Sequence, residues 1–425
     1  MLKPITIMYP VIPAKDEEER AALRPIGRHR ERYQAAIRGL AEIIQALDAM
    51  DVWGAAAIEH HFWSEGYELG PSPGAMNAYW AAITKRLRVG QLGYVIGTHN
   101  PIRVAEEVAV LDHLSQGRCF VGFARGYQSR WTNVLGQHFG TRATKSPNSI
   151  IYNPSLSLSG EARDRADDAD NRAIFEEHIE IALKAWTEES FSYKGRNWQI
   201  PYPYDTGVVD WPLARAGVTQ RLGAPGEVDG EGRTRRVSVV PAPYTKPHPP
   251  VFVAGSGSPE TVDFCARRGF IPTYFAGIQL AGPMSERYRA TAAAAGRSFA
   301  PGRNQCLVRW LQIGKSEEDA LNRIRWFDLD IWKNFYAAMG RRKVENNDYF
   351  GSLVNSGLFV FGTVDSVRRQ LLEQWKAFPA EYVALVNHYA QTPQEVVLET
   401  LDLFTRKVKP ALDEEVARAG RRAVP

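Results

Sequence analysis

The sequence contains few of the residues that mark extracellular, membrane or disulfide-rich proteins. Among 425 residues there are three cysteines, Cys119, Cys265 and Cys306, which are far apart and odd in number. This pattern disfavours a disulfide framework and a four-cysteine metal site, and it predicts a reducing compartment, the cytoplasm. No run approaches the roughly 18 apolar residues of a membrane span, and no cationic segment with an apolar core opens the chain. We therefore expect neither export nor membrane insertion.

The sequence also lacks a strong charge imbalance. Lys and Arg total 52 against 48 Asp and Glu, a net charge of +4 without a long basic run, so no nucleic-acid-binding surface is indicated. No helical HExxH spacing is present either, and we predict no metal site. With 44% hydrophobic residues the chain can bury a large core, and small molecules are the expected partners.

Strand-like and helix-like segments alternate along most of the chain, which is typical of a parallel sheet with helical crossovers. We count eight strand–helix pairs. The predicted strands are 5–9, 52–59, 87–96, 118–123, 251–254, 270–275, 305–313 and 382–386. The predicted helices include 33–50, 74–84, 101–115, 174–186, 285–295, 363–375 and 393–408.

Eight such units favour an α/β fold of the closed (βα)8 TIM-barrel type over an open doubly wound sheet. The open sheet usually has a glycine-rich turn after its first strand, and residues 9–13 (YPVIP) contain no glycine. Two polar, turn-rich stretches, about 141–170 and 201–236, are interpreted as long insertions after the fourth strand, the first of them a mobile loop. We predict one domain over residues 1–410 and a flexible tail over 411–425.

In a TIM barrel the chemistry lies on the loops that follow the strands. The second strand ends at Glu59-His60-His61-Phe62, and adjacent histidines of an extended segment point in opposite directions, so one of them is expected at the barrel mouth as a general base or hydrogen-bond donor. A histidine that only hydrogen-bonds to the loop backbone is the alternative.

Two further loops contain groups that suit an anion. Arg125 follows the fourth strand and precedes Gly126, so it can present a guanidinium to a phosphate; an ordinary ion pair is the alternative. Residues 254–261 (AGSGSPET) combine glycines, a Ser258 cap and a first-turn proline, which gathers N–H groups and hydroxyls at a helix N-terminus. Asn100 follows the third strand and is adequately explained as a helix cap.

These residues resemble those of the bacterial luciferase-like flavin monooxygenases. The segment from Ala57 to Gly136 carries most of the resemblance, through EHHF, then LRVGQLGYVIGTHNPIRVAEEVAVLDHLSQGRCFVGFARG, and finally NVLG. Weaker matches are AWTEESFSYKGRNWQIP, PHPPVFVAGSGSPETVDFCARRG and FGTVDSVRRQL. Together they cover about three quarters of the chain.

The resemblance implies a TIM-barrel enzyme that receives reduced FMN from a separate NAD(P)H-dependent reductase and forms a flavin C4a-hydroperoxide with O₂. It implies His60 as the active-site base and a non-prolyl cis bond at Leu92-Gly93 beneath the flavin. The implied cofactor-binding residues are Leu92, Gly93, Asn100, Arg125, Tyr127, Gly257, Ser258 and Thr261.

Two departures from luciferase disfavour light emission and a long-chain aldehyde substrate. Ala124 stands where luciferase has a reactive cysteine, and Gly257 stands where it has an acid. The prediction is therefore a two-component FMN-dependent monooxygenase acting on a hydrophobic organic substrate. A deazaflavin-dependent oxidoreductase and a non-catalytic flavin-binding subunit remain alternatives. The resemblance also implies a homodimer formed through the helices predicted at 74–84 and 101–115.

Overall fold

A closed parallel barrel is the centre of the computed structural model, which describes residues 1–149, 152, 154, 157–339 and 344–421. The order of strands around the barrel follows the sequence, and pairing of β9 with β10 and of β12 with β1 closes the ring. The eight strands are β1 (Lys3–Met8), β2 (Gly54–Ala57), β3 (Arg88–Gln91), β5 (Cys119–Ala124), β8 (Val251–Val253), β9 (Ile271–Tyr274), β10 (Cys306–Ile313) and β12 (Tyr382–Asn387). The predicted (βα)8 TIM barrel is confirmed.

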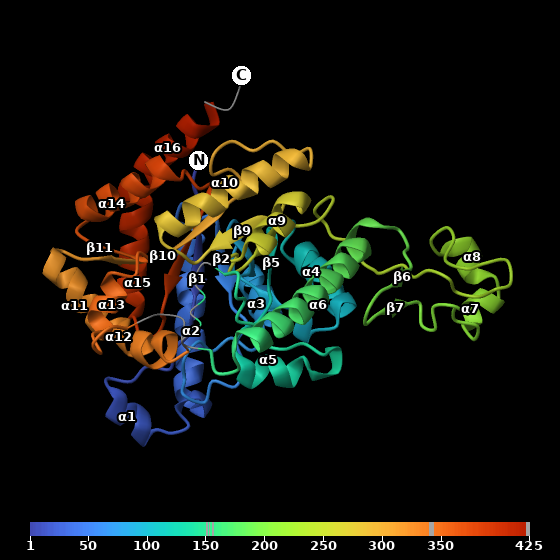
Figure 1. The fold of residues 1–425 in the computed structure, drawn as a ribbon, viewed down its shortest axis with the longest axis horizontal. Coiled ribbons are helices and arrows are strands. Elements are labelled where there is room, and N and C mark those ends of the chain that lie inside the picture. The colour runs from blue at the N-terminus through green and yellow to red at the C-terminus, as the bar shows by residue number, and fades with distance from the viewer. Residues whose placement is uncertain (150–151, 153, 155–156, 340–343, 422–425) are drawn as a thin grey trace.

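Helices follow the strands and cover the outside of the barrel (Figure 1). The main ones are α2 (Arg30–Leu47), α3 (Pro73–Ile83), α4 (Pro101–Leu114), α6 (Glu161–Thr187), α9 (Pro259–Arg268), α10 (Ile278–Ala294), α11 (Glu317–Phe327), α14 (Val364–Ala377) and α15 (Gln394–Leu403). Shorter or additional elements are α1 (Glu17–Ala22), β4 (Tyr94–Val95), α5 (Ser129–Leu135), β6 (Tyr193–Lys194), β7 (Gln199–Ile200), α7 (Pro212–Arg215), α8 (Val218–Leu222), α12 (Leu329–Ile331), α13 (Tyr349–Val354), β11 (Phe359–Gly362) and α16 (Lys409–Arg421).

Side chains that alternate along the strands build two separate apolar layers. In β5, Phe120 points into the barrel, whereas Val121 and Phe123 pack outward against the helices. Inside the barrel, Phe120 contacts Trp53 and Phe252 with ring centroids 5.3 and 5.5 Å apart. These aromatic rings fill the amino-terminal end of the barrel, so an open site can form only at the carboxyl ends of the strands.

The first insertion is more helical than its sequence indicates. Helix α6 begins at Glu161, not near residue 174 as predicted, so the expected loop over 141–170 is shorter. Ion pairs between Arg165 and Glu161 and between Arg163 and Asp167, four residues apart, stabilise the polar first turns without an apolar stripe. Residues 150, 151, 153, 155 and 156 of the predicted loop lie outside the described residues.

The predicted flexible tail is wrong for residues 411–421. They belong to α16, which packs against α14. Leu412, Val416 and Ala419 recur at helical spacing and are buried, so the apolar stripe stabilises a segment whose overall composition is polar. Residues 422–425 of the tail lie outside the described residues.

Two other elements differ from the sequence-based prediction. Helix α10 begins at Ile278, seven residues before the predicted start, and continues through Pro283. The strand β11 was not predicted, because a four-residue apolar run cannot be distinguished from buried helix by periodicity. It pairs with the second half of β10, Trp310 opposite Phe359.

The second insertion lies outside the barrel. Its short helices α7 and α8, and the hairpin β6–β7 that immediately precedes it, project from one side of the molecule (Figure 1). No helix among the described residues is both long enough and apolar enough to cross a lipid bilayer. The three cysteines are buried and free.

Candidate functional site

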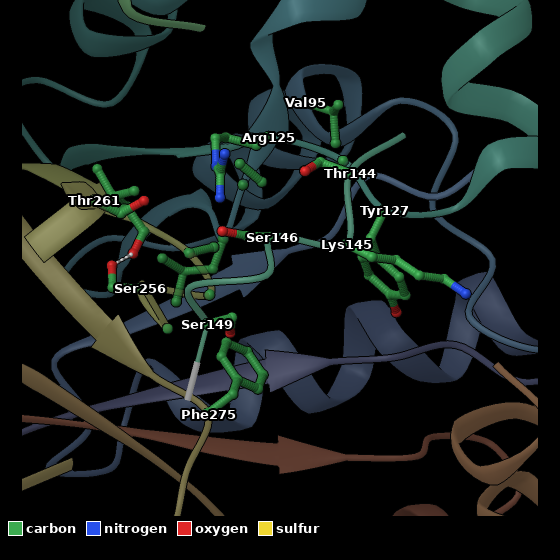
Figure 2. A pocket seen from close by; sticks show the side chains of 18 of the residues that line it. Val95, Arg125, Tyr127, Thr144, Lys145, Ser146, Ser149, Ser256, Thr261 and Phe275 are labelled. Carbon is green, nitrogen blue, oxygen red and sulfur yellow. Dashed lines mark hydrogen bonds between the residues drawn. The ribbon is translucent and has the colours of Figure 1, made fainter. Parts of the chain in front are cut away.

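A cavity of about 230 Å³ opens at the carboxyl ends of the barrel strands. Eight of the nine predicted site residues line it: His60, Leu92, Gly93, Arg125, Tyr127, Gly257, Ser258 and Thr261. They follow β2, β3, β5 and β8, so four loops separated by up to 200 residues meet at one place. The first insertion adds Thr144, Lys145 and Ser146 to the wall (Figure 2).

Asn100 is the exception, and its predicted contact with a cofactor is not supported. It is exposed and caps α4, where its side-chain oxygen accepts hydrogen bonds from the backbone N–H groups of Ile102 and Arg103 at 3.0 and 3.3 Å. The first backbone N–H groups of a helix have no partner within the helix, and Asn100 supplies the acceptor that they need.

The peptide bond between Leu92 and Gly93 is cis, at the position where the resemblance implies such a bond. Gly93 is required by close approach of two backbones, because a Cβ atom there would lie 2.4 Å from the carbonyl of Gly122 in β5. The backbone N–H of Val95, two residues on, donates a hydrogen bond to Glu59 at 2.6 Å. This contact fixes the segment after β3 against the end of β2.

One end of the cavity is built for an anion. Ser258 caps the ten-residue helix α9, and its hydroxyl lies 3.0 Å from that of Thr261. Arg125 approaches the same end from β5 (Figure 2), and its side chain is 13% exposed. At Gly255, a Cβ atom would meet nothing within 4 Å, so there is open space beside the helix N-terminus. Hydroxyls, a guanidinium and a helix N-terminus form a donor set that fits a phosphate group.

Sequence reasoning missed two charged residues at this end, Asp168 and Arg172. One oxygen of Asp168 accepts from Arg125 at 2.5 Å, and the other accepts from Arg172 at 3.2 Å. Arg172 also reaches the hydroxyls of Ser258 and Thr261, both at 3.4 Å. Burial opposes ionisation of Asp168, but Arg125, Thr144 and Arg172 together outweigh it and lower the pKa of the carboxyl. The i,i+4 spacing of Asp168 and Arg172 was the available signal, and it required knowing that α6 begins before them.

Asp168 also holds the first insertion onto the cavity. Its oxygens accept hydrogen bonds from the hydroxyls of Thr144 at 2.7 Å and Ser146 at 3.1 Å. In Figure 2, Arg125 and Ser146 extend into the same part of the pocket. Glu260 adds a second carboxylate, 3.6 Å from Arg172, so the two guanidinium groups are partly neutralised within the protein.

The opposite end of the cavity is aromatic. The rings that line it come from the loops after β1, β5 and β9, from helix α5, from strand β10 and from the segment between α12 and α13. They are Tyr9, Tyr127, Trp131, Phe275, Trp310 and Tyr336. Burial, with the carboxylate of Glu68 as a second cause, raises the pKa of both Tyr9 and Tyr336 well above 10, so both hydroxyls are protonated at neutral pH. This end can surround a ring or another apolar body and offer it hydroxyl groups.

The two adjacent histidines of the EHHF segment point to different partners. His60 lines the cavity, with Nδ1 2.6 Å from Oε2 of Glu68. His61 does not line it, and its Nε2 instead lies 3.0 Å from Oε1 of Glu59. Only His60 is therefore placed to exchange a proton with a molecule in the cavity.

Glu59 is another residue that sequence reasoning passed over. It is fully buried and hydrogen-bonds to His61, to His99 at 2.6 Å and to Val95. Burial alone would raise the pKa of Glu59, but the two histidines outweigh it and lower the pKa to about 2. The same carboxylate raises the pKa of His99 against the effect of burial. Glu59 is thus a buried anion that joins the loops after β2 and β3.

The described residues contain no group of three or more His, Cys, Asp or Glu side chains that could hold a metal ion. The phosphate-type donor set at one end of the cavity and the aromatic rings at the other fit an organic molecule with an anionic end and an apolar body.

Comparison with known proteins agrees with this geometry. The family model of luciferase-like monooxygenases matches residues 21–221 and 213–373, so the chain belongs to the luciferase-like monooxygenase family. An uncharacterised protein of Sinorhizobium fredii, y4wF, is 24% identical over 370 residues, which cover 84% of this chain and 86% of that protein.

Solved structures share the fold. The oxygenating constituent of 3,6-diketocamphane monooxygenase from Pseudomonas putida, in complex with FMN, superposes with a TM-score of 0.66 and 15% identity over 96% of this chain and 98% of its own. The coenzyme F420-dependent tetrahydromethanopterin reductase of Methanopyrus kandleri gives a TM-score of 0.55 and 14% identity over 97% and 99%.

Proposed function

We propose that this protein is the oxygenase of a two-component system, which binds reduced FMN and uses O₂ to oxidise a hydrophobic organic substrate. A separate NAD(P)H-dependent reductase supplies the reduced flavin. The observation that supports the proposal is a single cavity with a phosphate-type donor set at one end and aromatic rings with His60 at the other. Family membership and the FMN complex of the related fold agree with it.

The residues at the two ends of the cavity have different roles. Arg125, Ser258 and Thr261 hold the phosphate and fix the position of the cofactor, and the rings of the far end exclude water and orient the substrate. When bound, reduced flavin supplies the activation of O₂. His60 holds or accepts a proton at the reacting end through the ring nitrogen that does not contact Glu68.

A deazaflavin-dependent hydride transfer is the second candidate function. It is favoured by the fold likeness to a coenzyme F420-dependent reductase, a protein whose barrel covers nearly all of this chain. Such an enzyme would transfer hydride without O₂, so oxygen consumption distinguishes the two candidates.

The deciding experiment is an anaerobic titration with reduced FMN, followed by an oxygen pulse and, in parallel, a titration with reduced F420. The proposal predicts tight binding of reduced FMN, oxygen uptake, and a transient flavin spectrum distinct from those of reduced and oxidised FMN. Binding of reduced F420 but not of reduced FMN would support the second candidate. Binding of FMN with no effect on its reaction with oxygen would indicate a non-catalytic flavin-binding subunit.

The anion end can be tested in the same assay with Arg125→Ala. Loss of a charge-assisted contact to the phosphate should weaken binding of reduced FMN by about 10- to 150-fold, or roughly 1.5–3 kcal/mol. Arg130→Ala is the matched control, because Arg130 is half-exposed, pairs with Glu65 and does not line the cavity. Equal affinity in the two variants would remove Arg125 from the cofactor site.

A further inference from the structure

A buried carboxylate stands directly behind His60. Glu68 is 1% exposed, and its Oε2 lies 2.6 Å from Nδ1 of His60. Both atoms are buried, and neither has a hydrogen-bond partner among the described residues, so the 2.6 Å contact is a close approach of the two groups that is not aligned as a hydrogen bond. The backbone of Glu68 adopts a left-handed φ of +45°, a conformation that side-chain-bearing residues seldom take outside functional sites.

A chain of polar contacts extends from the other side of Glu68. The hydroxyl of Tyr336 donates to Oε1 of Glu68 at 2.9 Å and lies 3.2 Å from Nε2 of His388. His388 is fully buried, and its Nδ1 lies 2.7 Å from Oδ1 of Asp328. These contacts connect the cavity with Asp328, the residue that follows the last turn of α11.

The protons of this chain can be assigned from the chemistry of its members. The indole N–H of Trp310 is only a donor, and it points to Nε2 of His388 at 3.2 Å. Nε2 of His388 is therefore an acceptor, and the proton of this ring is on Nδ1, facing Asp328. Tyr336 has one proton, which it donates to Oε1 of Glu68, so its contact with His388 is not a second hydrogen bond. A carboxylate has no proton to give, so Oε2 of Glu68 is an acceptor toward His60.

We propose that Glu68 is a positioning residue that keeps the proton of His60 on Nδ1, so that Nε2 faces the cavity as the basic nitrogen. Tyr336 supplies one hydrogen bond to Glu68, and the carboxylate itself is the group that acts on His60. The proposal deepens the proposed function, since it states which nitrogen of His60 exchanges a proton. It concerns the tautomer of His60 and therefore has a test that needs no flavin.

The neighbouring histidine provides an internal comparison. His61 meets its carboxylate, Glu59, through Nε2, whereas His60 meets Glu68 through Nδ1. The proposal therefore predicts opposite tautomers for two consecutive residues, Nδ1–H for His60 and Nε2–H for His61. A shared change in solvent or fold would affect both rings, but loss of Glu68 should affect only one.

The test is nitrogen NMR of the full chain with ¹⁵N-labelled histidine, in which the two ring nitrogens of each histidine give separate signals. The signals of His60 are assigned by their absence from His60→Gln. In the unaltered protein we expect Nδ1 of His60 to carry the proton. In Glu68→Leu, which removes the acceptor but keeps the volume, we expect the Nδ1–H form of His60 to fall to a minor species while His61 is unchanged.

Tyr336→Phe is the matched control, because it removes one hydrogen bond to Glu68 but leaves the carboxylate beside His60. The Nδ1–H form should persist there as the major species. An unprotonated Nδ1 in the unaltered protein would overturn the proposal whether or not Glu68→Leu folds. So would an unchanged His60 pattern in a folded Glu68→Leu variant.

A kinetic comparison separates this proposal from the proposed function. If the protein is an oxygenase, Glu68→Leu should lower product formed per flavin oxidised at least tenfold and leave the affinity for reduced FMN within about twofold. If no oxygenation is found with the unaltered protein, the proposed function fails, yet the tautomer result still decides the role of Glu68.

Discussion

Replacing Glu59 with glutamine tests whether the buried anion between the loops after β2 and β3 stabilises the barrel mouth. The side chain of Glu59 is fully buried, while His61 and His99 are 15% and 32% exposed. Glutamine keeps the shape and an acceptor for the N–H of Val95, but it removes the charge that both histidines face. The expected result is a protein that folds with a lower unfolding temperature.

The pKa of Glu59 gives the size of the effect. A decrease from 4.5 to about 2 on folding corresponds to about 3 kcal/mol at pH 7. Because the folded-state pKa is the lower one, this stabilisation is present above pH 4.5 and is lost as the pH falls toward 2. With an unfolding entropy of about 2.1 cal/mol/K per residue, the loss lowers the melting temperature by roughly 3–4 °C.

His99 adds a dependence of the opposite sign. Its folded-state pKa is raised by Glu59, so its contribution is complete below pH 6.5 and is lost as the pH rises through the raised value. The difference between the unaltered protein and Glu59→Gln should therefore be largest between about pH 4.5 and 6.5 and smaller on both sides.

Differential scanning calorimetry from pH 3 to 9 measures this difference. Glu65→Gln is the matched control, since Glu65 lies in the same loop but forms a half-exposed pair with Arg130, which is worth at most about 1 kcal/mol. A Glu59→Gln variant that melts no lower than Glu65→Gln at pH 5.5, or a difference that does not change with pH, would refute the account of Glu59 as a stabilising buried anion.

Three other predictions concern different parts of the molecule. His60→Ala should retain affinity for reduced FMN but lose about 10²–10⁴ in product formation, whereas His61→Ala should chiefly lower the melting temperature; equal product yields would show that His60 is not the base. Leu114→Asp should convert the expected homodimer to monomer in sedimentation, because Leu114 of α4 is 61% exposed and Tyr79 of α3 is 46% exposed, and both belong to the helices of the expected interface; a monomer before substitution would contradict the dimer. Leu412→Ala should cost about 2–5 kcal/mol in urea unfolding, because Leu412 of α16 is fully buried, whereas Leu222→Ala at a 79% exposed position should cost under about 0.5 kcal/mol; equal effects would mean that α16 is not part of the core.

The sequence was sufficient to predict the barrel and eight residues of the cavity wall, because both depend on local patterns. Alternating apolar strands and helices produce their periodicity within a few turns of chain, so eight units could be counted without a structure. Residues that follow the strands must gather at one end of a barrel, which is why His60, Arg125 and Ser258 were placed together correctly. Asn100 follows a strand as well, but its side chain is used by the nearest helix N-terminus.

The remaining features depend on contacts between distant segments, which leave no periodic signal. Asp168 could not be assigned to Arg125 before α6 was known to begin at Glu161 and to bring it within 2.5 Å. Glu68 lies in a glycine-rich loop, and its position behind His60 is set by Tyr336, which is 268 residues away in the sequence. The sequence by itself determined that side chains at the ends of the strands gather at one end of the barrel, because strand ends are local features. Only the tertiary structure decided which of these side chains are charged, which are paired and which point into the cavity, because burial and neighbouring charges arise only when the barrel closes.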